Sequence, residues 1–246
     1  LKNLRIGPQK THWKMVYLKP LLGWSNTLPT IVPKTTPSKA HTELPSIPLC
    51  IPEIRGNEKE YVTSCIETGW VSSVGTFVDK FEQQFADYLG AKHAIAMSSG
   101  TAALHIGLQL IGIQPNDEVL VSSLTFIATA NAIRYMNAWP VFVDAEIQTG
   151  NIDIEQIEGA ITDRTKAISV VHFLGMPVDM DKINEVAKKN NLFVLEDCAL
   201  AIGTYYKGIH AGLHGDAGCF SFYPVKHMTT AEGGMLITKH ADLAEQ

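Results

Sequence analysis

The sequence predicts an α/β fold in which a mostly parallel sheet carries helices on both faces. From about residue 49 onward, helix-like and strand-like segments alternate along the chain. The strand-like segments are short, apolar and often β-branched, as at residues 141–143 and 168–171, which is typical of strands buried on both faces. Alternation of this kind favours a parallel sheet, because a chain that returns to a parallel strand needs a crossover, usually a helix.

Seven strands and six helices are expected. The strand-like runs are 94–97, 118–122, 140–143, 166–171, 193–196, 217–222 and 234–238. Helical periodicity extends over 57–68, 77–89, 101–111, 126–137, 154–161 and 179–190. In the third of these helices, for example, Leu104, Leu108 and Ile111 recur at the spacing of one helix face.

The first 48 residues differ from the rest of the chain. They carry seven Lys or Arg and one acidic residue, a net charge of +6, together with seven of the twelve prolines. The remainder has thirteen basic and twenty-four acidic residues, a net charge of −11. Because residues 1–48 show no sustained helical or strand period, we expect a disordered leader there. An organellar transit peptide and foreign upstream sequence are both open interpretations of it.

The composition excludes several classes of protein. No run approaches the roughly 20 apolar residues that a membrane span requires, and no secretory signal is visible. The four cysteines form no CxxC pair, which favours a reduced, cytoplasmic protein without a metal site. We expect no membrane partner and no nucleic-acid partner.

Ligands of such sheets bind beyond the carboxyl ends of the strands, and residues 98–103 (SSGTAA) follow one of them. Gly100 would let backbone approach a ligand closely, and the N–H groups of Thr101 and Ala102 would face it. A helix N-terminus with free N–H groups is a suitable phosphate site. The alternative is an ordinary Ser/Thr helix cap.

Two acidic residues, Glu196 and Asp197, end another apolar strand. A carboxylate here could keep a heterocyclic nitrogen protonated, bind a metal, or cap the next element. Because no His, Asp or Glu recurs at ligand spacing, a metal is the weaker functional interpretation.

Lys226 follows the strand at 217–222 and lies between Pro224 and a turn rich in Thr and Gly. This position indicates a cleft, where desolvation would lower the lysine pKa and make the amine a nucleophile toward an aldehyde. Ser221, five residues earlier, could donate to a phosphate. A lone lysine in a loop is otherwise a solvated surface charge.

A phosphate site, a carboxylate and a reactive lysine, each at a strand end and in this order, are what pyridoxal phosphate (PLP) requires. With them, the chain resembles the DegT/DnrJ/EryC1/StrS family of sugar aminotransferases, which has the type I aminotransferase fold. The matching stretches are 67–70, 99–104, 125–131, 140–144, 196–199 and the region of Lys226. The resemblance implies that residues 49–246 are a PLP-binding large domain. Because a helix is just starting at 241–246 where the chain stops, we expect the C-terminal small domain to be missing.

The resemblance also implies roles for single residues. Lys226 would form the Schiff base with PLP, and Asp197 would pair with the pyridine nitrogen. The phosphate-contacting positions are Gly100, Thr101, Ala102 and Ser221. Phe126 would stack on the cofactor ring, unless it is a core residue of the 126–137 helix.

Three further positions need comment. Trp70 lies in a loop that the family places near the substrate, although a packing role is equally compatible. Leu200 stands where the family usually has Gln or His, and it has no donor for the cofactor's ring hydroxyl. His172 and His227 are near the expected site, and we expect both to be buried histidines with satisfied hydrogen bonds.

By the same resemblance, the reaction is transfer of an amino group, usually from glutamate, to a keto group of a nucleotide-linked deoxysugar, by a homodimer. One alternative is a sugar dehydrase that uses the same cofactor. Such enzymes carry His in place of the Schiff-base lysine, and His227 is adjacent to Lys226. Another is a non-catalytic regulatory relative on the same fold, which would be free to lose Asp197 or Lys226.

Overall fold

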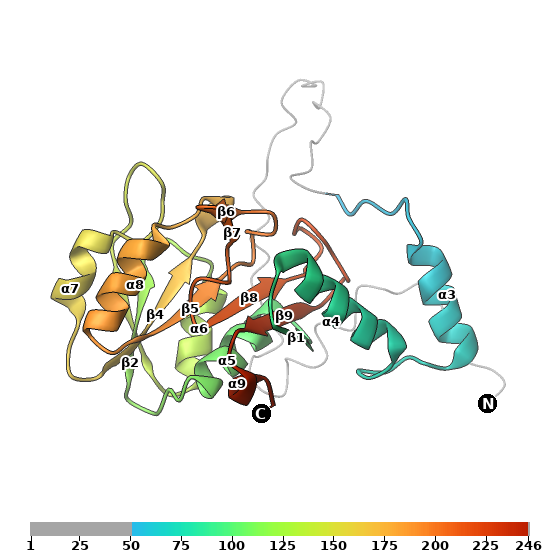
Figure 1. Ribbon diagram of the computed structural model, residues 1–246, viewed down its shortest axis with the longest axis horizontal. Coiled ribbons are helices and arrows are strands. Elements are labelled where there is room, and N and C mark those ends of the chain that lie inside the picture. Colours follow the sequence, from blue (N-terminus) through green and yellow to red (C-terminus); the bar gives the residue numbers. More distant parts are fainter. Residues whose placement is uncertain (1–50, 246) are drawn as a thin grey trace, which may run out of the picture. The chain divides into compact units, whose positions relative to one another are not determined.

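A computed structural model describes residues 51–245, so the leader predicted over residues 1–48 lies outside the described residues. The described part is built on a seven-stranded sheet of order β1-β9-β8-β5-β4-β2-β3 (Figure 1). Its strands are β1 (His93–Met97), β2 (Glu118–Ser122), β3 (Trp139–Val143), β4 (Thr165–Val171), β5 (Phe193–Asp197), β8 (Ala217–Ser221) and β9 (Gly234–Thr238). Neighbouring strands from β3 to β8 are parallel, and β9 is antiparallel to both β8 and β1. The predicted mostly parallel sheet is confirmed.

Helices cover both faces of this sheet. Alternate residues of each strand point to opposite sides, and apolar residues on both sides are buried against the helices. On one face, α5 (Gly100–Leu110) and α6 (Ile127–Tyr135) pack on Val119, Val121, Leu195 and Leu236. On the other face, α7 (Ile157–Ala160) and α8 (Met180–Lys189) pack on Leu120, Ile168, Val170 and Val194. At the β9 end of that face, α4 (Thr76–Leu89) contributes Phe85 and Leu89 to a cluster with Phe220, Met235 and Ile237.

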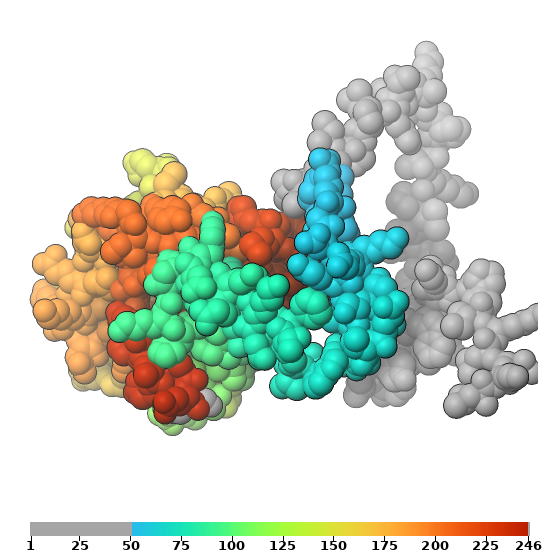
Figure 2. Space-filling model, turned by 45° about the vertical axis from the view of Figure 1, so that its right-hand side comes forward, coloured from blue at the N-terminus to red at the C-terminus, as the bar shows by residue number. Residues whose placement is uncertain are grey.

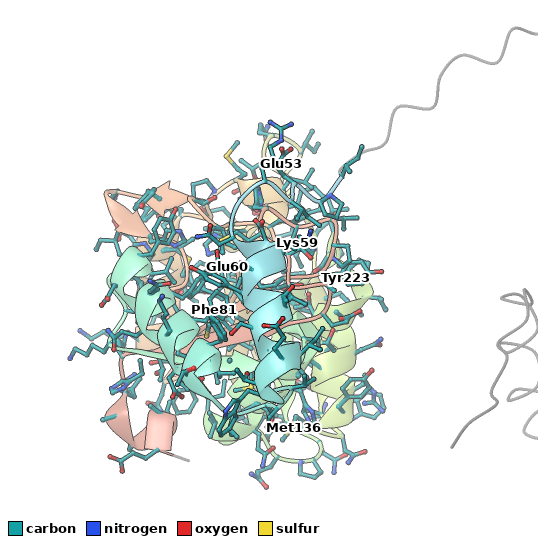
Figure 3. All side chains as sticks on the ribbon, turned by 90° about the vertical axis from the view of Figure 1, so that its right-hand side faces the viewer. Glu53, Lys59, Glu60, Phe81, Met136 and Tyr223 are labelled. Atoms are coloured by element: carbon teal, nitrogen blue, oxygen red, sulfur yellow. The ribbon has the colours of Figure 1, made fainter. Side chains whose placement is uncertain are left out.

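Aromatic side chains join α4 to the sheet. Phe81, labelled on α4 in Figure 3, packs at an edge-to-face angle against Phe222, with ring centroids 5.1 Å apart. Phe85 makes the same kind of contact with Phe220 at 5.1 Å. Such pairs contribute about 0.5–1.5 kcal/mol beyond their buried area. These contacts hold the strand that leads to the Lys226 loop.

The helix α3 (Glu58–Thr68) buries no residue. Its Tyr61 ring lies 5.1 Å from the ring of Phe77 at the start of α4, and Val62 and Ile66 are exposed. In the space-filling view, residues 51–75 lie at the surface beside α4 (Figure 2). In the described part of the chain, no helix is long and apolar enough to cross a membrane.

The expected helix at 154–161 is a 3-10 turn (Ile154–Gln156) followed by the single helical turn α7, and a second 3-10 turn spans Phe173–Gly175. The sequence prediction missed the two-stranded hairpin of β6 (Tyr205–Tyr206) and β7 (Ile209–His210). Lys207 and Gly208 both have positive φ in its two-residue loop, as a type I′ hairpin turn requires. The segment after β9 begins a short helix, α9 (Ala241–Glu245).

Candidate active site

A cavity of about 530 Å³ lies beyond the carboxyl ends of β1, β5 and β8. Six of the seven predicted site residues line it, and Ala102 does not. The lining residues are Ser99, Gly100, Thr101, Leu104, Phe126, Ala128, Asp197, Ala199, Ser221, Tyr223, Val225, Lys226 and Glu232. Residues as far apart in the sequence as Ser99 and Glu232 therefore meet at one edge of the sheet, where parallel strands place their ligands.

The N-terminus of α5 forms one wall of this cavity. Ser99 is the N-cap, and its hydroxyl accepts a hydrogen bond from the Ala102 N–H at 3.1 Å, while its carbonyl accepts from Ala103 N–H at 3.0 Å. The helix-cap interpretation is therefore correct for Ala102, whose N–H is engaged within the helix. Among the described residues, none accepts from the N–H of Gly100 or Thr101, so these two donors are available to an anion.

Close backbone approach explains two glycines at this wall. A Cβ on Gly100 would lie 2.7 Å from Cβ of Ser221, and a Cβ on Gly234 would lie 2.4 Å from the Ser99 carbonyl oxygen. Either contact would push the loop after β1 away from β8 or β9. The small residues therefore bring the Ser221 hydroxyl next to the free N–H groups of α5.

Asp197 is the buried acid of the cavity, with 6% of its surface exposed. Its Oδ2 accepts a hydrogen bond from the Thr129 hydroxyl at 2.7 Å, and its Oδ1 accepts from the Ala199 N–H at 3.1 Å. Burial raises the pKa of Asp197, although the hydrogen bonds from Thr129 and Ala199 act in the opposite direction. A carboxylate has about four acceptor positions, so this one can accept a further donor from the cavity.

Lys226 is half-buried and faces an aromatic ring. Its Nζ lies 6.0 Å from the ring centroid of Phe126. Burial lowers the pKa of the amine, and the charge of Asp197 opposes that shift. A lysine with a lowered pKa is more often neutral and therefore nucleophilic. The interpretation of Lys226 as a fully solvated surface charge is wrong.

Phe126 is the N-cap residue of α6, and 74% of its surface is exposed. The helix begins one residue later than the periodicity predicts, because Phe126 has the extended backbone conformation of a cap (φ −70°, ψ 140°). Phe126 is therefore not a core residue of the helix. Its ring is available to pack on a ligand.

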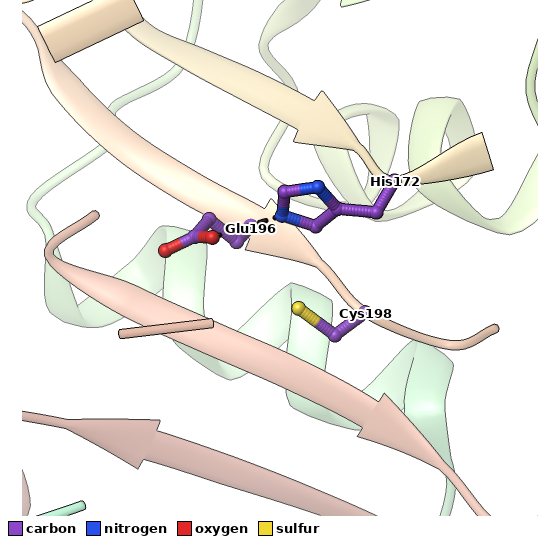
Figure 4. A group of neighbouring side chains, drawn as sticks. All are labelled: His172, Glu196 and Cys198. Atoms are coloured by element: carbon purple, nitrogen blue, oxygen red, sulfur yellow. Dashed lines mark hydrogen bonds and ion pairs between the residues drawn. The ribbon is translucent and has the colours of Figure 1, made fainter. Parts of the chain in front are cut away.

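Glu196 points to the opposite face of the sheet, into a cluster with His172 and Cys198 (Figure 4). The ligand atoms of this cluster lie within 4.8 Å of one another, a grouping that the sequence spacing did not reveal. Glu196 accepts hydrogen bonds from His172 Nε2 and from the N–H groups of Gly212, His214 and Gly215, at 2.6–2.9 Å. His172 Nδ1 accepts from the Val178 N–H at 3.2 Å. Both residues thus have their polar atoms engaged by the protein, as expected for His172.

The remaining predicted positions do not line the cavity. Trp70 is exposed and lies over Gly75, where a Cβ would be 3.3 Å from its ring. His227 is exposed, so the expectation of a buried histidine is wrong there. Leu200 is partly buried and contributes no polar side-chain atom.

The sequence prediction missed Thr129, Tyr223 and Glu232. Tyr223 and Glu232 line the cavity from the loops that flank Lys226. Thr129, in the first turn of α6, lies behind Asp197 and follows Thr125 by four residues, and the two hydroxyls meet across the N-cap of the helix. That four-residue spacing was the available signal for Thr129.

The model of the DegT/DnrJ/EryC1/StrS aminotransferase family matches residues 52–246. The GDP-perosamine synthase of Caulobacter vibrioides is 51% identical over 203 residues, which are 82% of this chain and 55% of that protein. The PLP form of a putative sugar aminotransferase from Streptococcus pneumoniae has a TM-score of 0.76 at 31% identity, covering 80% of this chain and 54% of that one. A mutant GDP-4-keto-6-deoxymannose-3-dehydratase with bound GDP-perosamine has a TM-score of 0.77 at 30% identity, with coverage of 81% and 53%.

The chain spans about half the length of the curated relatives it matches. It belongs to the DegT/DnrJ/EryC1/StrS aminotransferase family.

Proposed function

We propose that this chain is the cofactor-binding part of a PLP-dependent aminotransferase that aminates a keto group of a nucleotide-linked sugar. The observation that carries the proposal is the placement of Lys226 Nζ, which faces the Phe126 ring in a cavity that the buried Asp197 also lines. A reactive amine, an aromatic face and a buried carboxylate are the three groups that a pyridine aldehyde cofactor needs from its protein.

The donor set of the cavity fits PLP. The N–H groups of Gly100 and Thr101, with the hydroxyl of Ser221, would bind the phosphate at the N-terminus of α5. Asp197 would accept from the protonated ring nitrogen, and Phe126 would orient the ring by contact with one face. Lys226 would form the covalent link to the cofactor.

Bound PLP supplies an electron-withdrawing ring that takes up the electrons released when the α-proton of an amino acid is removed. The chain supplies the proton transfers and the orientation. With the cofactor and an amino acid bound, the neutral Lys226 amine would be placed to accept the α-proton and to donate it again. Asp197, dehydrated by burial, would favour the protonated form of the ring nitrogen.

The substrates are inferred from relatives. The name GDP-perosamine synthase and the GDP-perosamine bound to the dehydratase relative support a nucleotide-linked sugar as the acceptor. Glutamate as the amino donor and a homodimer follow from the family resemblance, and a cytoplasmic location follows from the cysteine pattern; all three belong to the proposal.

The dehydratase relative makes dehydration of the sugar the alternative reaction. In this chain, however, Lys226 lines the cavity and the exposed His227 does not. That difference supports amino transfer. The presence of both Asp197 and Lys226 also favours a catalytic protein over a regulatory one.

The test is chemical trapping of the lysine. The complete protein mixed with PLP should give a visible absorbance band that borohydride removes, and the label should map to the peptide containing Lys226. A Lys226→Arg variant, which keeps the positive charge, should take no label. Label on another lysine, or none in the wild type, would overturn the assignment. Glutamate should then convert the cofactor of the unreduced protein to its aminated form, and a nucleotide-linked keto sugar added afterwards should gain the amino group without losing water.

A further inference from the structure

We infer that Thr129 is a positioning residue that holds the Asp197 carboxylate toward the cavity, with Thr125 fixing the direction of its hydroxyl. Thr129 is 1% exposed and does not line the cavity, so it acts through Asp197. The inference rests on the proposed function, because the orientation of Asp197 matters only where a ligand nitrogen meets it.

A chain of hydrogen bonds defines the arrangement. Thr129 Oγ1 lies 2.7 Å from Asp197 Oδ2 and donates to it, and the Thr125 and Thr129 hydroxyl oxygens lie 2.9 Å apart. A hydroxyl has one proton. Because a carboxylate only accepts, the Thr129 proton is committed to Asp197. The Thr125 proton is then the one that can bridge the two hydroxyls at 2.9 Å, a shorter contact than its alternative to the Phe126 carbonyl oxygen at 3.4 Å. The chain therefore runs from Thr125 through Thr129 to the carboxylate.

The first turn of α6 couples this chain to the aromatic wall. Thr125 and Thr129 flank the N-cap residue Phe126, whose ring faces Lys226. The same turn thus presents the ring face to the cavity and the hydroxyl to the carboxylate behind it. Asp197 Oδ1 is held separately by the Ala199 N–H at 3.1 Å, within the turn that follows β5. Contacts to both oxygens, from two different elements, fix the plane of the carboxylate.

The groups around Asp197 make the Thr129–Asp197 hydrogen bond important for keeping the carboxylate ionised. The titratable groups around Asp197 are Lys226, His172, Glu196 and the Cys198 and Cys219 thiols. Among the described residues, Thr129 is the only side chain that donates a hydrogen bond to this carboxylate. Burial raises the pKa of Asp197, and the Thr129 bond opposes that rise by stabilising the charged form.

The test compares Thr129→Val, which removes the hydroxyl at nearly constant volume, with Thr129→Ser, which keeps it. We expect Thr129→Val in the complete protein to bind PLP about tenfold more weakly or worse, the size of a hydrogen bond to a buried charge. The cofactor's link to Lys226 should also keep its proton to a higher pH. Without the Thr129 hydrogen bond the ring nitrogen is less fully protonated, so it repels the positive charge on that link less. Thr129→Ser should recover most of both properties.

The matched control is Thr238→Val. Thr238 is also buried, and its hydroxyl donates to the Asp216 carbonyl at 2.8 Å, away from the cavity. This variant should lose as much stability as Thr129→Val and keep the wild-type PLP affinity and titration midpoint. If Thr129→Val does not fold, Thr125→Val should show a smaller shift in the same direction.

The outcomes separate the two proposals. Wild-type protein that takes no borohydride label at Lys226 contradicts the proposed function itself. Wild-type labelling together with unchanged affinity and midpoint in Thr129→Val and Thr125→Val overturns the positioning role. A Thr129→Ser variant as impaired as Thr129→Val also overturns it, because the loss would then come from packing.

Discussion

Glu196 and Asp197 are consecutive residues at the end of β5, yet the two faces of the sheet give them opposite environments. Glu196 is fully buried and accepts hydrogen bonds from His172 and three backbone N–H groups. Asp197 accepts from one hydroxyl and one N–H and borders the cavity. One carboxylate has its donors supplied by the protein, whereas the other has acceptor positions left for a ligand.

The pKa shifts follow the same division. Burial alone would raise the pKa of Glu196, but the hydrogen bonds from His172, Gly215 and Gly212 outweigh it and lower the pKa. At Asp197 burial prevails over the bonds from Thr129 and Ala199, so its pKa is raised. The Glu196 side of the strand end therefore contributes to folding. The Asp197 side carries a cost in stability that a cationic ligand can offset.

The largest stability effect is expected on the Glu196 side. Glu196→Gln places an amide among donors that need an acceptor, and it should lower the free energy of unfolding by about 3 kcal/mol. Urea titration of the complete protein measures this. Glu158→Gln is the matched control, because Glu158 forms an exposed ion pair with Lys189, and it should cost less than about 1 kcal/mol. Equal effects from the two variants would show that the Glu196 network contributes little.

On the Asp197 side the effect should fall on turnover. Asp197→Asn keeps one oxygen that can accept from the Ala199 N–H, and its amide N–H can donate to the Thr129 hydroxyl oxygen, so the cofactor should attach to Lys226 as before. Turnover should drop on the order of 10²-fold or more, because a neutral amide cannot keep the ring nitrogen protonated. The cofactor-free variant should be as stable as the wild type or more so. Near-normal turnover would mean that Asp197 serves only the turn after β5.

The two acids should also respond oppositely to pH. The contribution of Glu196 to stability is complete above its ordinary pKa of 4.5 and is lost as the pH falls below it. The gap in stability between wild type and Glu196→Gln should therefore close in acid. For Asp197, ionisation in the folded state costs stability as the pH rises above the ordinary value of 3.8. The advantage of cofactor-free Asp197→Asn should therefore grow with pH, in a series of urea titrations.

The sequence alone could not predict most of this difference between the environments of Glu196 and Asp197. The strand-like runs gave every strand of the large sheet to within about one residue, because buried β-branched segments are local signals. The period of two also shows that Glu196 and Asp197 point to opposite faces. Which face holds the cavity depends on contacts with Thr129, 68 residues earlier, and with the 212–215 loop. Such long-range contacts leave no local pattern, and the same is true of the His172–Glu196–Cys198 grouping.

The smallest expected effect concerns Phe126, where a substitution should change PLP binding but not stability, unlike a substitution in the core. Phe126 is exposed, so Phe126→Leu should leave the free energy of unfolding unchanged. It should weaken PLP binding by roughly three- to tenfold, the range of an aromatic contact beyond its buried area.

Phe142→Leu, at an exposed phenylalanine on β3, is the matched control and should change neither property. Phe222→Leu, in the buried α4 cluster, should lower stability instead. Fluorescence titration with PLP and urea denaturation distinguish the three variants. If Phe126→Leu binds PLP as the wild type does, the ring does not contact the cofactor, and the wall of the site must be assigned to another element.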